Sequence, residues 1–212
     1  MSHTHASERR DDSDSHQERM QARQQALGAE LRAKTTKRGV IVVHTGDGKG
    51  KSSAAFGIAL RAAGHGQRVG VLQFIKGSWR TGEQMAIARF PEIEHVLCGE
   101  GFTWDTQDRE RDTACARAGW ERARQMIDGA RGELPAYDVV VLDELNLVID
   151  FGYLPVAEVV EVLASKPPHL SIVVTGRGAK PELIAIADTV TEMRSVKHAF
   201  EAGIRARRGI EF

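Results

Sequence analysis

The chain has 212 residues, of which 42% are hydrophobic and 27% are charged, a composition typical of one globular domain. Its 29 basic residues balance its 29 acidic residues, so we expect neither a general nucleic-acid coat nor a polybasic membrane anchor. The two cysteines, Cys98 and Cys115, lie too far apart for a CxxC metal or redox motif. Two cysteines in a chain of this length do not make a disulfide framework, which favours a reducing cytoplasmic location. The longest aliphatic run, residues 40–43, is too short to span a bilayer, and the polar N-terminus predicts no secretory signal.

The first 38 residues differ in composition from the rest of the chain. They carry eight basic and six acidic side chains and almost no large apolar residue before Met20. We therefore expect residues 1–15 to be disordered, because little apolar surface is available to offset the entropy of ordering. Residues 16–34 are rich in helix formers with a thin apolar stripe, which is consistent with a solvated helix or with a lid over a ligand.

From residue 39 to residue 212, strand-like and helix-like segments alternate. In chain order we predict a strand at 40–44, a helix at 52–63, strands at 68–74 and 137–142, helices at 109–131 and 155–165, a strand at 171–175, a helix at 181–187 and a short strand at 189–193. Residues 75–108 show no clean period and are predicted to be a long functional loop. The alternation indicates an α/β fold with a mostly parallel sheet covered by helices on both faces.

A glycine-rich loop lies between the first predicted strand and the first predicted helix. Glycines let successive backbone N–H groups face an anion, and the helix start adds partial positive charge. We expect Lys51 to lie on the outer phosphates of a nucleotide and the Ser52 hydroxyl to bind Mg²⁺. Only three residues separate Gly46 from the Gly50-Lys51 pair, one fewer than in the ordinary phosphate loop. The predicted loop comprises Gly46, Asp47, Gly48, Lys49, Gly50, Lys51, Ser52 and Ser53.

Two carboxylates follow an aliphatic strand. Asp143 and Glu144 end the run VVVLDE, which places acid at the carboxyl edge of the sheet beside the phosphate loop. Such carboxylates hold Mg²⁺ directly or through water, whereas helix capping is the alternative role. Together with Ser52, they form the predicted metal site, for Mg²⁺ or Mn²⁺.

Six motifs together resemble those of the P-loop-type ATP:corrinoid adenosyltransferases, a family with a RecA-like, P-loop NTPase fold. They occur in family order from about residue 39 to the end of the chain: TGDGKGKSSAAFG (45–57), QFIKG (73–77), GFTWDT (101–106), LDE (142–144), TGRG (175–178) and VKHAF (196–200). The short loop belongs to this pattern, where it accompanies ATP bound so that C5′ faces the nucleophile.

The resemblance implies a specific reaction. The 5′-deoxyadenosyl group of ATP moves to the cobalt(I) of a reduced corrinoid and triphosphate is released, in the synthesis or salvage of adenosylcobalamin. It also implies a homodimer, a reduced flavoprotein as electron donor, and no nucleic-acid or membrane partner. Among site residues, it implies that Phe102 and Trp104 crowd the lower corrin face, and that Lys51 neutralises the triphosphate. Arg177, in a glycine-flanked turn after a strand, is a further candidate for nucleotide contact.

Two other functions remain open from the residues alone. An ordinary P-loop kinase or ATPase would attack the γ-phosphate and leave ADP. A RecA-like motor would act on nucleic acid, which the zero net charge disfavours. The basic stretch from Arg194 to Glu211 is interpreted as a solvated helix face or a contact with an anion.

Overall fold

The computed structural model describes residues 4–75, 81–98, 108–129 and 137–211, and its contacts divide the chain into residues 1–37 and residues 38–212. The first unit contains one helix, α1 (Thr4–Ala33). The helix thus begins before residue 16, where its start was expected, and the disorder expected over residues 1–15 stays a prediction. No proline or glycine lies between Thr4 and the expected start at 16 to end the helix. Met20, Leu27 and Leu31 are each more than half exposed on it.

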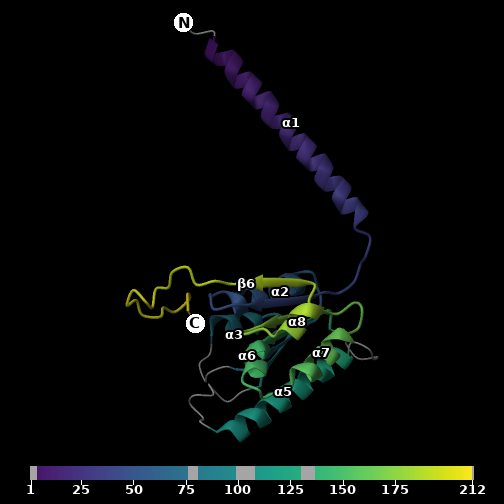
Figure 1. Ribbon diagram of the computed structural model, residues 1–212, viewed down its shortest axis with the longest axis vertical. Coiled ribbons are helices and arrows are strands. Elements are labelled where there is room, and N and C mark those ends of the chain that lie inside the picture. The colour runs from purple at the N-terminus through teal and green to yellow at the C-terminus, as the bar shows by residue number, and fades with distance from the viewer. Residues whose placement is uncertain (1–3, 76–80, 99–107, 130–136, 212) are drawn as a thin grey trace. The chain divides into compact units, whose positions relative to one another are not determined.

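The second unit is built on a six-stranded, wholly parallel sheet (Figure 1). Its strand order is β3-β2-β4-β5-β1-β6, so the two edge strands, β3 and β6, flank four central ones. The strands are β1 (Ile41–Thr45), β2 (Val69–Gln73), β3 (Ile93–Leu97), β4 (Val139–Asp143), β5 (Ser171–Thr175) and β6 (Thr189–Glu192). Because all strands run the same way, their carboxyl ends meet at one edge, where ligands bind in open α/β sheets.

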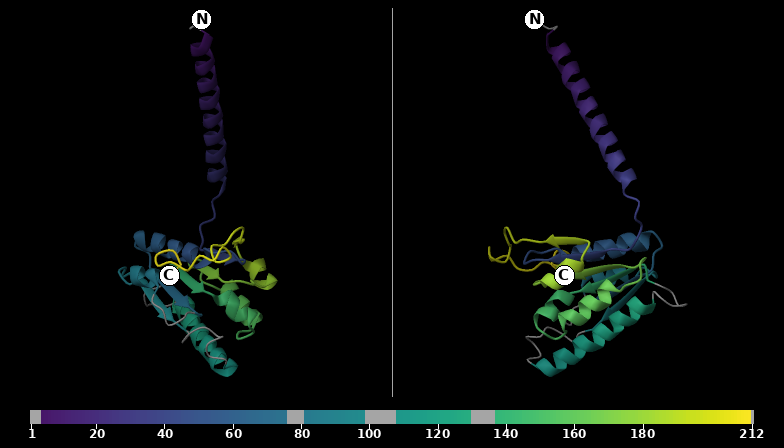
Figure 2. Two further views of the ribbon diagram at one scale, coloured as in Figure 1. Left: turned by 90° about the vertical axis from the view of Figure 1, so that its left-hand side faces the viewer. Right: turned by 45° about the vertical axis from the view of Figure 1, so that its right-hand side comes forward.

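Helices cover both faces of this sheet (Figures 1 and 2). They are α2 (Lys51–Gly64), α3 (Gly82–Ile87), α5 (Arg109–Gly129), α6 (Leu145–Asp150), α7 (Val156–Ala164) and α8 (Pro181–Ile186). Alternate residues of β4 divide between the two layers: Val139 and Val141 pack with α2, and Val140 and Leu142 pack with α5 and α7. Burial on both faces explains why the central strands read as unbroken aliphatic runs. The α/β sheet with helices on both faces is confirmed.

The predicted elements are present with small shifts in their bounds, and three further elements occur in the part of the chain that the structure describes. Residues 75–108 contain α3 and β3, and the apolar segment after Glu144 forms α6. Ile93 is the one fully buried residue of the edge strand β3, so this strand lacks the continuous apolar sequence of the inner strands. At the start of α3, the Gln84 side-chain oxygen accepts a 3.3 Å hydrogen bond from the Thr81 N–H. The basic C-terminal stretch has turns rather than the predicted helix.

Two helical glycines should respond oppositely to substitution by alanine. A Cβ on Gly57 in α2 would meet nothing within 4 Å, so Gly57→Ala should stabilise the protein by about 0.5–1 kcal/mol. A Cβ on Gly119 in α5 would lie 2.6 Å from the Cβ of Cys98, so Gly119→Ala should cost about 1–3 kcal/mol. Urea denaturation measures both changes in the free energy of unfolding. Equal shifts for the two variants would contradict the packing of α5 against the end of β3.

Candidate active site

The glycine-rich loop joins the end of β1 to the start of α2 at the carboxyl edge of the sheet. Gly46 and Gly50 have φ angles of 91° and 107°, a left-handed region that favours glycine. A Cβ on Gly46 would also lie 2.4 Å from the carbonyl oxygen of Met193, and one on Gly48 would lie 2.7 Å from the backbone of Arg194. The loop therefore needs glycine for its own conformation and for the segment of chain that packs against it.

Lys51 folds back onto this loop. Its ammonium donates hydrogen bonds of 2.7 Å to the carbonyl oxygens of Gly46 and Gly48, and the residue is 8% exposed. Burial lowers the pKa of the ammonium, as does Arg177, whereas the charges of Glu144 and Asp47 raise it. These interactions bring five of the predicted site residues together around one buried cation.

The start of α2 is open to an anion. Gly50, at the N-cap, has no side chain that could cap the helix, and the first N–H groups of any helix lack intrahelical partners. Ser52 is half-buried and Ser53 is exposed in the first turn. With the helix dipole, these groups favour a negatively charged ligand.

Asp143 ends β4 in a buried polar cluster. Its carboxylate is 1% exposed and accepts hydrogen bonds of 2.7 Å from the amide of Gln73 and from the hydroxyl of Thr175. The Gln73 oxygen in turn contacts His95 Nε2 at 2.9 Å and accepts from Gln84 at 3.2 Å. The cluster joins the ends of β2, β4 and β5 and extends to β3, so it orders this edge of the sheet.

Glu144 has an unusual backbone conformation. Its φ of 65° is the only positive value of a non-glycine residue in the described part of the chain, and such a conformation costs about 1–2 kcal/mol. The Thr175 hydroxyl accepts a 2.9 Å hydrogen bond from the Glu144 N–H. The Glu144 carboxylate lies over Gly176, where an added Cβ would be 3.2 Å from Oε2. Strain at Glu144 is a typical feature of functional sites.

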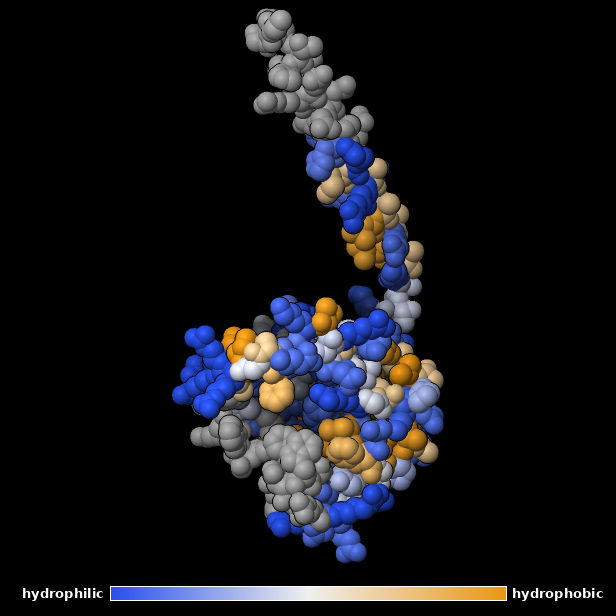
Figure 3. Space-filling view, turned by 60° about the vertical axis from the view of Figure 1, so that its left-hand side comes forward, coloured by the Kyte–Doolittle hydropathy of each residue, from blue (hydrophilic) through white to orange (hydrophobic). Residues whose placement is uncertain are grey.

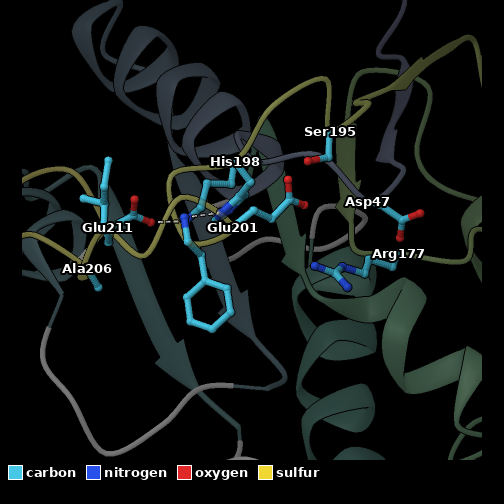
Figure 4. A pocket seen from close by; sticks show the side chains of 10 residues that line it. Asp47, Arg177, Ser195, His198, Glu201, Ala206 and Glu211 are labelled. Atoms are coloured by element: carbon cyan, nitrogen blue, oxygen red, sulfur yellow. Dashed lines mark hydrogen bonds and ion pairs between the residues drawn. The ribbon is translucent and has the colours of Figure 1, made fainter.

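A cavity of about 560 Å³ lies beside the phosphate loop (Figure 4). Its walls come from the loop, from Arg177 and from residues 193–211, which we call the C-terminal strap. The strap is fastened by an ion pair between Lys49 and Glu211 and by a 2.7 Å hydrogen bond from Gly48 N–H to the Met193 carbonyl. Asp47, Lys49, Arg177, His198, Phe200 and Glu201 are among the lining residues.

Sequence reasoning found some of these residues and missed others. The candidates Phe102 and Trp104 lie outside the described residues. In the sequence, Thr175 stands out only as part of the TGRG motif. No sequence pattern indicates that its hydroxyl links Asp143 to Glu144. The strap was missed as a wall of the site, although its contacts explain why Gly46 and Gly48 are glycines.

The Thr175 hydroxyl should therefore matter more than its methyl group. Thr175→Val keeps the shape but leaves an oxygen of Asp143 and the N–H of Glu144 without this partner, at a cost of about 1–3 kcal/mol. Thr175→Ser keeps both bonds and should be the milder change in urea denaturation. A larger loss with serine than with valine would show that packing, not the hydroxyl, is what Thr175 contributes.

Comparison with known proteins agrees with this geometry. The model of the family described as "ATP:corrinoid adenosyltransferase BtuR/CobO/CobP" matches residues 37–212. The chain is 50% identical over 198 residues to a corrinoid adenosyltransferase of Pseudomonas aeruginosa, covering 93% of this chain and 95% of the relative. It is 45% identical over 199 residues to the corrinoid adenosyltransferase CobA of Salmonella typhimurium, covering 92% and 98%.

A more distant likeness is to the solved structure of EssC (ATPases 2 and 3) from Geobacillus thermodenitrificans. It has 14% identity and a TM-score of 0.43 over 81% of this chain and 35% of that one, too little to carry an argument. None of the described helices is long and apolar enough to cross a membrane. The family match over residues 37–212 and the relatives of 45–50% identity show that this protein belongs to the ATP:corrinoid adenosyltransferases.

Proposed function

We propose that this enzyme transfers the 5′-deoxyadenosyl group of ATP to the cobalt(I) of a reduced corrinoid. A cobalt–carbon bond forms as cobalt gives two electrons to C5′, and the bond from C5′ to the phosphate oxygen breaks. Triphosphate leaves with that electron pair, and the cobalt ends as cobalt(III). Cobalt(I) is a strong nucleophile, so the protein needs no general base and works by positioning and charge stabilisation.

The observation that carries the proposal is the buried ammonium of Lys51. It lies on two neutral carbonyl groups of the loop and has a pKa lowered mainly by burial. A triphosphate bound by residues 46–53 would supply the negative charge that neutralises the Lys51 ammonium. As the leaving group gains charge, Lys51 and the N–H groups at the start of α2 would stabilise it. Arg177 stands close enough to act on Lys51 electrostatically and would add a second cation.

The residues present fit Mg²⁺, or Mn²⁺ in its place. No cluster of three histidine, cysteine or acidic side chains that could cage a metal occurs among the residues that the structure describes. Magnesium instead binds through one or two protein oxygens together with substrate phosphates and water. Glu144 and Ser52 would supply these oxygens, while Asp143, already holding two hydrogen bonds, would orient Glu144 through Thr175. Bound Mg²⁺ would offset part of the triphosphate charge.

Further parts of the proposal rest on the family resemblance. Phe102 and Trp104 would crowd the lower corrin face and remove an axial ligand, which eases reduction to cobalt(I). A reduced flavoprotein would supply the electron, and the helix over residues 16–34 would act as a lid. We also propose a homodimer that works in the cytoplasm, in the synthesis or salvage of adenosylcobalamin.

The fate of ATP tests the reaction. Attack at C5′ leaves all three phosphates joined, so we expect one inorganic triphosphate for each adenosylated corrinoid, and none without reduced corrinoid. The assay combines ATP, Mg²⁺ and chemically reduced cobalamin without oxygen, follows the corrinoid spectrum, and separates the phosphates by anion exchange. ADP and phosphate formed at the rate of turnover would instead favour the kinase or ATPase.

Removing the Lys51 ammonium should slow turnover strongly. Lys51→Ala leaves the backbone of the loop in place and removes one charge-stabilising donor, which typically costs about 10²–10³ in rate. Arg61→Ala is the matched control, because it removes a cation from the last turn of the same helix. If Lys51→Ala kept a rate close to that of the control, the assignment of residues 46–53 to the triphosphate would be wrong.

A further inference from the structure

We propose that Cys98 and Cys115 form a reversible redox site, in which hydrogen peroxide joins their two sulfur atoms in a disulfide. The bond would link the residue that follows β3 to the early part of α5. In a cytoplasmic protein, disulfides are usually transient and serve catalysis or the sensing of oxidants. This inference does not depend on the proposed function, because neither cysteine belongs to the phosphate loop over residues 46–53.

Gly119 of α5 brings the two cysteines close together. A Cβ on Gly119 would lie 2.6 Å from the Cβ of Cys98 and 3.0 Å from its sulfur atom, so Cys98 packs directly against the α5 backbone. Cys115 precedes Gly119 by four residues and so lies on the same face of the helix, where Cβ positions are about 5–6 Å apart. The Cβ atoms of the two cysteines are therefore within about 9 Å of each other, and a disulfide needs about 3.5–4.5 Å. A shift of at most a few ångströms closes the remaining distance.

The two thiols also act on each other electrostatically. The pKa of Cys98 is raised to about 11, mainly by burial, while Arg122 lowers it and the charge of Cys115 raises it. Arg122 follows Gly119 by three residues in α5, so Cys98 senses charges on both sides of the glycine that it contacts. Because solvent and salt screen charges over longer distances, this coupling supports the proximity derived from Gly119.

The two sulfur atoms differ in their readiness to react. The nucleophile in thiol oxidation is the thiolate, not the thiol. With a pKa raised to about 11, Cys98 stays protonated near neutral pH. Cys115 is therefore the residue that attacks the oxidant, and Cys98 is the residue that resolves the product into a disulfide.

The reaction has two steps. The Cys115 thiolate attacks one oxygen of hydrogen peroxide, the O–O bond breaks, and a sulfenic acid forms as hydroxide leaves. The Cys98 sulfur then attacks the Cys115 sulfur, the S–O bond breaks, and water leaves with the Cys98 proton. The hydroxide takes up the proton that Cys115 gave to water at the start. In total, two thiols are oxidised and one peroxide is reduced, which yields one disulfide and two water molecules.

The site is accessible to a dissolved oxidant. Both cysteines are half-buried rather than fully buried. Hydrophilic side chains lie at the lower end of the face drawn in Figure 3, at the height of α5 in Figure 1, so water surrounds the exposed side of this helix. The same oxidant would also oxidise cobalt(I), the nucleophile of the proposed reaction. Disulfide formation would therefore mark conditions under which adenosyl transfer cannot proceed.

The test treats the full chain with a stoichiometric amount of hydrogen peroxide, alkylates the remaining thiols in denaturant, and analyses the chain by mass spectrometry. In the wild type we expect both thiols to disappear together into a disulfide within one chain, and dithiothreitol to restore both. Two free thiols after treatment, or disulfides formed only between chains, would overturn the proposal.

Two serine variants are matched controls, since each keeps one thiol. In Cys98→Ser, oxidation of Cys115 should stop at the sulfenic acid, which dimedone traps. In Cys115→Ser, the remaining Cys98 thiol should be lost about tenfold more slowly than the wild-type pair, or slower still, because it stays protonated. Serine is close to cysteine in size and both positions are half-buried, so both variants are expected to fold, which urea denaturation checks. Loss of Cys98 in Cys115→Ser at the wild-type rate would show that the two cysteines do not react as a pair.

Discussion

The site depends on an ammonium group that is held out of water by the peptide carbonyls of its own loop. Lys51 is almost fully buried, and the carbonyl groups of Gly46 and Gly48 replace part of its hydration. Neutral acceptors can solvate a cation but cannot cancel its charge. A net attraction for anions therefore persists at the start of α2. The parallel sheet brings Glu144 to the same edge, close enough for its charge to act on that of Lys51.

Order at this edge comes from a second buried charge. The Asp143 carboxylate is satisfied by Gln73 and Thr175, which end the strands on either side of β4. A fully hydrogen-bonded network of this kind is rigid, because breaking any one hydrogen bond leaves a buried polar group without its partner. That rigidity allows Glu144 to keep a left-handed backbone conformation. The more buried carboxylate, that of Asp143, therefore serves the geometry of this edge.

Much of this arrangement could be predicted from the sequence. The inner strands are continuous aliphatic runs because both of their faces are covered, and the phosphate loop follows from its spacing and from its place between a strand and a helix. The edge strand β3 escaped prediction because its residues 94–97 remain partly or largely exposed. The bridge through Thr175 and the cavity beside Phe200 arise from residues far apart in the chain. No local pattern encodes such contacts, since they exist only after β5 and the strap have packed against β1 and its loop.

The contact between Gly48 and the backbone of Met193 and Arg194 also bears on the order in which the protein matures. These residues come from opposite ends of the second unit, and β1 pairs with β6 beside them. During synthesis the chain emerges from its N-terminus, so strands β1 to β5 are available before the residues that brace the phosphate loop. A nascent chain that stops short of residue 193 would contain every residue of the loop without the wall that supports it. Support of the loop by this wall would thus be acquired only after the residues from 193 onward have been made.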